Sequence, residues 1–241
     1  RLYSRILARA KQYEQAINNL QDMITEMDEL RRKAAAILPR IQDPRQQASL
    51  WLSSREATRQ QVLMYQSLAY VYQAQGDIDL AIQTFREAYK LLPDDMGLNN
   101  DFGYTLADHG RDLDEAEKLI RFAVSENPEE AAYMDSLGWL YYHKGDFKKA
   151  RTWLVRSASM EEGQDAVIFD HLGDTCWRLG DKDQAVRNWQ RSMEIYEQKR
   201  RKGDAEPDDK SAVKTRDKLA TVAKGQPPEV AEVVPASRTA P

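Results

Sequence analysis

The sequence predicts an all-α solenoid built from helix–turn–helix repeats, and three observations support this fold class. Residues of the same kind recur every 34 or 35 positions. Within each repeat, small and large apolar residues fall at the spacing of one helix face. Each repeat also has a glycine where its first helix would end. A fixed period of this length is typical of solenoids, in which neighbouring repeats stack on one another.

Small residues mark one position in the first helix of each repeat and two positions in the second. The first-helix residues are Ala69, Gly103, Gly138 and Gly173. In the second helix, an alanine precedes a large apolar residue by four positions, in the pairs Ala81 and Phe85, Ala116 and Ile120, Ala150 and Leu154, and Ala185 and Trp189. A further small set is Ala88, Ala123, Ala158 and Ser192. Small side chains let helix backbones approach closely, so these positions predict the seams between helices.

The breaks between the paired helices have the composition of turns. Glycine stands at positions 76, 110, 145 and 180, and three of the breaks read "QGDIDLA", "KGDFKKA" and "LGDKDQA". Glycine adopts the left-handed conformation that ends a helix, and an aspartate after it can cap the next one. Each repeat is therefore expected to be two helices joined by a tight turn.

These residues together resemble the tetratricopeptide repeat, which implies a right-handed superhelix. A leucine precedes the small residue at Leu68, Leu137 and Leu172, a tyrosine follows it at Tyr72 and Tyr141, and a proline closes two units at Pro93 and Pro128. Four units fall at 62–95, 96–130, 131–165 and 166–199. The pattern departs from the family in small ways, such as Cys176 in place of the tyrosine of the fourth unit.

The regions on either side of the four units are less regular. Residues 1–61 are expected to hold truncated or degenerate helices of the same type, the first of which runs to about Pro39. Residues 200–224 are expected to form a capping helix that covers the exposed face of the last unit, with Val213, Leu219 and Val222 or Ala223 as its apolar side chains. Residues 225–241, "GQPPEVAEVVPASRTAP", are rich in proline and predict a flexible tail.

Composition limits the possible partners and sites. Residues 62–199 carry 15 basic and 25 acidic side chains, which argues against nucleic acid as a partner. No apolar run reaches the roughly 18 residues needed to span a bilayer. The only cysteine is Cys176, the histidines are not at metal-ligand spacing, and no glycine-rich phosphate loop follows a strand. We therefore expect neither metal nor cofactor.

Aromatic and acidic residues share one face of the first helices, which line the concave surface in this type of repeat. They predict a groove for a protein or peptide, with Trp and Tyr as binding anchors and acids that favour basic groups on the partner. The expected groove residues are Tyr70, Asn100, Tyr104, Asp108, Asp135, Trp139, Tyr142, Asp170, Asp174 and Trp177.

Two alternatives to this groove remain open. The aromatic rings could pack between neighbouring helices while the acids only solubilise the surface. The protein could instead self-associate into a homo-oligomer through its first helices, near Trp51 and Leu52, or through its tail. Catalysis is not expected, because no nucleophile, base and anion hole converge in the sequence. The chaperone-binding clamp of the family is also not expected, because the corresponding faces lack lysine and arginine.

Part of the chain is similar to a narrower group within this family. The stretches "GYTLADHGRDLDEAEKLI" and "DSLGWLYY" resemble the C-terminal repeats of bacterial tetratricopeptide proteins, including outer-membrane lipoproteins that act as adaptors. The similarity covers about residues 96–199. It implies an adaptor role, such as joining a periplasmic C-terminal processing protease to its substrates, and a location in the cell envelope. Residue patterns within the chain leave a cytoplasmic location equally open.

Overall fold

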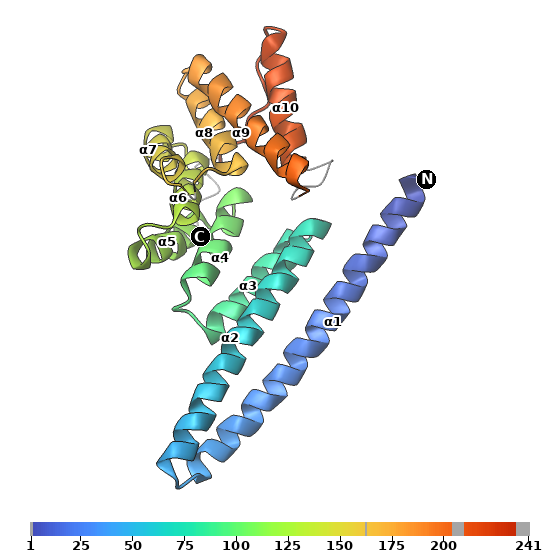
Figure 1. The fold of residues 1–241 in the computed structure, drawn as a ribbon, viewed down its shortest axis with the longest axis vertical. Coiled ribbons are helices and arrows are strands. Elements are labelled where there is room, and N and C mark those ends of the chain that lie inside the picture. Colours follow the sequence, from blue (N-terminus) through green and yellow to red (C-terminus); the bar gives the residue numbers. More distant parts are fainter. Residues whose placement is uncertain (1, 162, 204–209, 235–241) are drawn as a thin grey trace. The chain divides into compact units, whose positions relative to one another are not determined.

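The computed structural model describes residues 2–161, 163–203 and 210–234. The described residues form helices and no strand, which confirms the all-α class (Figure 1). The chain divides into two compact units between Phe102 and Gly103, within α4 (Met96–Asp108). Each unit is built from antiparallel neighbouring helices joined by short turns.

The first unit contains two long helices that pack against each other. Helix α1 (Leu2–Ile37) leads through a 3₁₀ turn, η1 (Leu38–Arg40), into α2 (Pro44–Gln75), and α3 (Ile78–Leu91) packs on α2. Asp43 caps α2 by accepting a hydrogen bond from the Arg45 amide, and Pro44 occupies the first turn, where its missing N–H is not needed. Helix α2 crosses position 62 without a break, so the first expected repeat begins inside a longer helix.

The second unit stacks its helices in chain order after the last part of α4. They are α5 (Leu113–Glu126), α6 (Ala131–His143), α7 (Phe147–Ala158), α8 (Ala166–Arg178), α9 (Lys182–Lys202) and α10 (Lys210–Ala223). Helix α10 packs on α9 within the region where a capping helix was expected, as Figure 1 shows. Its residue Ala212 joins a small apolar cluster with Ala166, Ile195 and Tyr196.

The inward face of α10 differs from the one that the sequence predicted. Val213 is exposed, whereas Ala212, Thr215 and Lys218 are buried. The prediction sought a purely apolar stripe, but the surface that α10 covers carries aspartates. A helix that covers carboxylates must present polar groups to them, because buried charges require partners. Val213 consequently lies off the packed face.

The turns between paired helices adopt the predicted conformation. Gly76, Gly110, Gly145 and Gly180 all have positive φ, between 60° and 94°. Asp146 and Asp181 then cap the following helices by accepting hydrogen bonds from the amides of Lys149 and Gln184. Asp77 stands at the start of α3 but makes no side-chain capping hydrogen bond, so the predicted cap is absent there. In the other two turns, the glycine ends one helix and the aspartate caps the next, which folds the pair back on itself.

The seam between paired helices contains the predicted small residues. Ala81, Ala116, Ala150 and Ala185 have no exposed surface, and neither have Phe85, Ile120, Leu154 and Trp189. A Cβ atom placed on Gly138 would lie 2.7 Å from Leu154 Cγ and 3.2 Å from the Ala150 carbonyl oxygen. The backbone of α6 therefore approaches α7 too closely for any side chain at position 138.

One member of the third small set was wrong. At this position of α7 the fully buried residue is Ser157, not Ala158. It lies seven residues after Ala150, the same interval that separates Ala185 from Ser192, so both serines fall on the inward face. Their hydroxyls make equivalent hydrogen bonds, Ser157 to the Ala131 carbonyl and Ser192 to the Ala166 carbonyl, each 2.7 Å long.

A search of the described helices for one that could cross a bilayer identified no candidate, since none combines sufficient length with sufficient apolar character.

Candidate functional site

An open cavity of about 950 Å³ lies in the second unit. Its floor comes from the first helices of three consecutive repeats, through Tyr104 and Asp108 of α4, Trp139 of α6, and His171 of α8. Side chains of α10 and residues 229–234 complete its walls. The volume is within the range of ordinary ligand sites, and its lining mixes aromatic rings with charged groups.

A stack of rings runs across the cavity floor from α6 to α8. The Trp139 ring lies nearly parallel to His171, with centroids 3.8 Å apart, and to Tyr142, with centroids 4.7 Å apart. Trp139 Nε1 donates a hydrogen bond of 2.8 Å to Asp108 Oδ1. Stacking and hydrogen bonding together fix the orientation of the indole, which is only 4% exposed.

Two buried histidines, His171 within this stack and His143 edge-on to Trp139, differ in their electrostatic surroundings. Burial alone lowers the pKa of His171, but the nearby Asp135 carboxylate, 2.9 Å from His171 Nδ1, outweighs burial and raises the pKa above its ordinary value. His143 has no carboxylate at that distance, and its burial lowers the pKa to about 4. The cavity therefore favours a charged ring at His171 and a neutral ring at His143.

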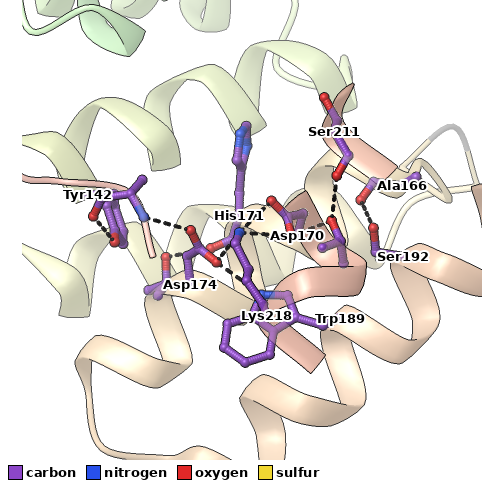
Figure 2. A network of polar contacts seen from close by, with 12 residues as sticks. Tyr142, Ala166, Asp170, His171, Asp174, Trp189, Ser192, Ser211 and Lys218 are labelled. Carbon is purple, nitrogen blue, oxygen red and sulfur yellow. Dashed lines mark hydrogen bonds and ion pairs between the residues drawn. The ribbon is translucent and has the colours of Figure 1, made fainter. Parts of the chain in front are cut away.

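Figure 2 shows how the acids of α8 are neutralised from within the chain. Lys218 of α10 extends its ammonium group between Asp170 and Asp174, with Nζ 2.9 Å from Asp170 Oδ2 and 2.6 Å from Asp174 Oδ1. The side chains of Lys218 and Asp174 are almost fully buried, at 7% and 2% exposure. Thr215 adds a hydrogen bond of 2.8 Å to Asp170 Oδ1.

Asp174 is the most fully coordinated of these acids. Trp189 Nε1 donates to its Oδ1 at 3.0 Å, and the backbone amide of Ala231 donates to its Oδ2 at 3.0 Å. Burial raises the pKa of the Asp174 carboxyl, against the opposing effect of the Lys218 charge. Each carboxylate oxygen thus has at least one partner inside the protein, as a buried carboxylate requires.

The chain returns to the cavity after α10, through residues 226–234, called here the return segment. The Ala231 carbonyl accepts hydrogen bonds from the Tyr142 hydroxyl, at 2.6 Å, and from Arg178 Nη2, at 2.7 Å. The Val234 amide donates to the His143 carbonyl at 3.0 Å. The sequence predicted a flexible tail here; the return segment has these defined contacts, whereas residues 235–241 of that tail lie outside the described residues.

The structure brings most of the expected groove residues together and separates three others from them. Tyr104, Asp108, Trp139, Asp170 and Asp174 line the cavity. Asp135 and Tyr142 are buried behind it, where they bond to the lining residues His171 and Ala231. Trp177 instead packs its ring 5.9 Å from Trp189 of α9, with Lys182 over it. Tyr70 and Asn100 belong to the first unit, where the Tyr70 hydroxyl donates a short hydrogen bond to Asp101.

Sequence reasoning missed three contributors to the site: His171, Lys218 and the return segment. His171 was considered only as a metal ligand, although it lies one residue after Asp170 on a helix with several groove residues. Lys218 could have been found from its spacing, because Ala212, Thr215 and Lys218 are three residues apart and share one helix face. Nothing in the return segment's composition indicates where it lies.

Comparisons with known proteins are consistent with the repeat architecture. Sequence models described as tetratricopeptide repeat match residues 62–95 and 100–162. The TPR repeat-containing protein PA4667 of Pseudomonas aeruginosa is 39% identical over 77 residues, which are 32% of this chain and 12% of that protein. The chain thus matches about one eighth of the length of that relative.

Solved structures give the same result for the fold alone. TTC0263, a thermophilic TPR protein of Thermus thermophilus, has a TM-score of 0.54 at 17% identity, over 83% of this chain and 99% of that chain. MamA of Desulfovibrio magneticus has a TM-score of 0.48 at 17% identity, over 76% of this chain and 98% of that chain.

Proposed function

Because this chain is a tetratricopeptide-repeat protein, we propose that it is a scaffold that binds a segment of another polypeptide in the cavity of its second unit. The observation that supports this most is the open cavity of about 950 Å³ over a floor of stacked aromatic rings. The ring stack itself is buried and shapes the floor, while Tyr104, half-buried at the cavity, offers a partner a rigid aromatic contact at little cost in conformational entropy. The fold itself is characteristic of protein-binding scaffolds rather than enzymes.

Most acids of the cavity are paired within the protein, so charge contributes less to the choice of partner than the sequence suggested. Asp170 and Asp174 are paired with Lys218, and Asp135 is paired with His171. Asp108 keeps 37% of its side chain exposed at the cavity. A basic group of the partner would therefore meet Asp108, and the remaining contacts would be made with Tyr104 and the rim of the ring stack.

A library of displayed random peptides, selected on the full chain, tests this proposal. Affinities of the selected peptides are then measured by fluorescence polarisation for the wild type, for Tyr104→Ala and for Asp108→Lys. Tyr104 is half-buried at the cavity and Asp108 is exposed, so neither replacement removes a core side chain. We expect both variants to weaken binding about tenfold or more, as is usual for anchor residues.

A matched control separates the cavity from general charge effects. Glu126→Lys reverses an exposed acid near the end of α5, outside the cavity lining, and should leave the affinity unchanged. If the selected peptides bind the Tyr104 and Asp108 variants as tightly as the wild type, the cavity is not the binding site.

A second candidate function is self-association through the first unit. Leu30, Ile37, Trp51 and Leu52 of α1 and α2 are between 47% and 61% exposed, which is unusual for large apolar side chains on a monomer's surface. Light scattering over a concentration series, with a Trp51→Ser, Leu52→Ser variant beside the wild type, distinguishes the two functions. A wild type that is a dimer and a variant that is a monomer would favour this candidate.

The partial identity with the Pseudomonas aeruginosa protein and the resemblance of residues 96–199 to bacterial adaptors suggest the cellular role. We propose that the bound segment belongs to one of two proteins that the scaffold holds together. A location in the cell envelope stays a prediction.

A further inference from the structure

The return segment binds the second unit mainly through its own backbone. Ala231 has both of its main-chain groups bonded, the amide to Asp174 and the carbonyl to Tyr142 and Arg178. Three residues later, the Val234 amide donates to the His143 carbonyl. Main-chain recognition of this kind fixes an extended conformation but constrains side-chain identity only where space is limited.

Val234 packs closely against Gly110, so the space beside this residue of the return segment is limited. A Cβ atom on Gly110 would lie 2.6 Å from Val234 Cγ2. Gly110 has φ of 60°, which ends α4, and its lack of a side chain also leaves room for a branched apolar residue of the return segment. The small side chain of Ala231 leaves its backbone accessible to Asp174 and Arg178.

In the return segment, exposed residues and hydrogen-bonded residues each recur at an interval of three. Glu229 and Glu232 are exposed, while the hydrogen-bonded residues Ala231 and Val234 are also three apart. A period of three is that of the polyproline II helix, in which the backbone has no internal hydrogen bonds and its polar groups are free to bind a partner. Pro227 and Pro228 precede this stretch and favour the same conformation.

The return segment also covers residues that the sequence assigned to the groove. Tyr142 has no exposed surface and Asp174 is 1% exposed, and both bond to Ala231. Burial raises the pKa of Tyr142 to about 12, so its hydroxyl keeps the proton that it donates to the Ala231 carbonyl. A partner can therefore reach these two residues only in place of the return segment.

We propose that residues 229–234 are a built-in occupant of the groove, and that the partner is an extended segment of the same chemistry that replaces them. Such a segment has a small residue at the place of Ala231, a branched apolar residue three positions later and polar residues facing outward. This inference rests on the proposed function and adds the partner's chemistry and the competition that it must overcome. An attached occupant competes at a high effective concentration, so only a well-matched partner enters.

The test compares a labelled peptide, PPEVAEVV, which copies residues 227–234, on two forms of the full chain. One is the wild type and the other is Ala231→Pro, Val234→Pro. This double variant lacks the two amide donors that bond to Asp174 and His143, and proline is compatible with an extended segment. We expect the peptide to bind the double variant at least about tenfold more tightly than the wild type, because the attached competitor is weakened.

A measurement of backbone order and two further variants complete the design. The order of the return segment is followed by ¹⁵N relaxation of residues 229, 230, 232 and 233, which keep their N–H groups in every variant. The segment should be rigid in the wild type and mobile in the double variant. Glu229→Gln, Glu232→Gln changes only exposed side chains and should behave as the wild type. Tyr142→Phe, added to the double variant, should weaken peptide binding because it removes a donor to the carbonyl that the peptide presents.

Three results would overturn the inference: equal peptide affinity for the wild type and the double variant, no binding to a double variant whose segment is mobile, or a segment that stays rigid in that variant. Library-selected peptides that need Tyr104 and Asp108 but leave residues 229–233 of the wild type as rigid as before would retain the proposed function and still reject this inference.

Discussion

Two regions of the second unit are stabilised in different ways: the seam between α6 and α7, and the cavity between α8 and α10. In the seam, Gly138 and Leu154 meet with no polar side chain between them, and both residues lie within one repeat. In the cavity, Asp174 is buried and Asp170 is half-buried. Lys218 bonds to both and Ala231 bonds to Asp174, each from more than 40 residues away along the chain. The seam depends on shape, whereas the cavity depends on remote charge and hydrogen-bond partners.

The difference shows which parts of the molecule constrain each other. Each repeat contains both sides of its own seam, because the small and the large residues recur with the same period. The acids of α8 become stable only after the chain has folded α10 and the return segment over them. The elements that follow the repeats therefore do more than cap the solenoid, since they also define what the groove exposes.

The largest effect is expected from removing Lys218, the buried cation of the cavity. Lys218→Met retains the length of the side chain but leaves Asp170 and Asp174 without their cation, so we expect a loss of about 3–5 kcal/mol in the free energy of unfolding at neutral pH. Urea titration measures it. Lys214→Met, an exposed lysine on the same helix, should change stability by less than about 0.5 kcal/mol. Similar values for the two variants would contradict the buried-charge account.

A smaller effect is expected in the seam. Gly138→Ala places a methyl group 2.7 Å from Leu154 Cγ and should lower stability by about 1–3 kcal/mol through overpacking. The matched control is Gly97→Ala in α4, where the nearest atom is 3.4 Å away and alanine improves helix propensity. Thermal unfolding should move in opposite directions for the two substitutions, and a stabilised Gly138→Ala would mean that the seam is looser than described.

The two buried serines, Ser157 and Ser192, test whether neighbouring repeats are stabilised independently. Ser157→Ala and Ser192→Ala each remove one buried hydrogen bond to a carbonyl and should each cost about 1 kcal/mol. Because the serines lie in different repeats, the double variant should show the sum of the two effects. Strong non-additivity in denaturant titrations would indicate that the repeats do not act as independent units at this position.

The two histidines of the cavity should respond to pH in opposite directions, although the effect at neutral pH is small. The pKa of His143 falls from 6.5 to about 4 on folding, so its contribution to stability is present above pH 6.5 and is lost as the pH falls toward 4. The pKa of His171 is raised, so its contribution is present below pH 6.5 and is lost as the pH rises through the folded value.

Unfolding titrations between pH 4 and pH 8 check these signs through single variants. His143→Asn should flatten the acidic side of the profile, and His171→Asn should flatten the side above pH 6.5. A His143→Asn protein that loses stability with falling pH as steeply as the wild type does would show that the ring is accessible to protons in the folded state.

Local patterns in the sequence predicted the seam and the turns, but they could not predict the cavity completely. Gly138, Leu154 and Gly145 act through neighbours in the same repeat, so their spacing carries the information. The spacing of Asp135 and Trp139 placed them on one helix face, but their partner His171 comes from the next repeat. Lys218 and Ala231 approach from outside the repeats, where no period applies. The error at Ala158 arose from choosing residue type over spacing.

The most direct test of the account concerns Trp139, whose indole N–H donates to Asp108 at the floor of the cavity. Its indole resonance can be followed by NMR while a library-selected peptide is added to the isotope-labelled full chain, with Trp153 of α7 as an internal reference outside the cavity lining. The account predicts a saturable shift of the Trp139 signal and an unchanged Trp153 signal. A bound peptide that shifts Trp153 or Trp51 and leaves Trp139 unmoved would contradict binding in this cavity.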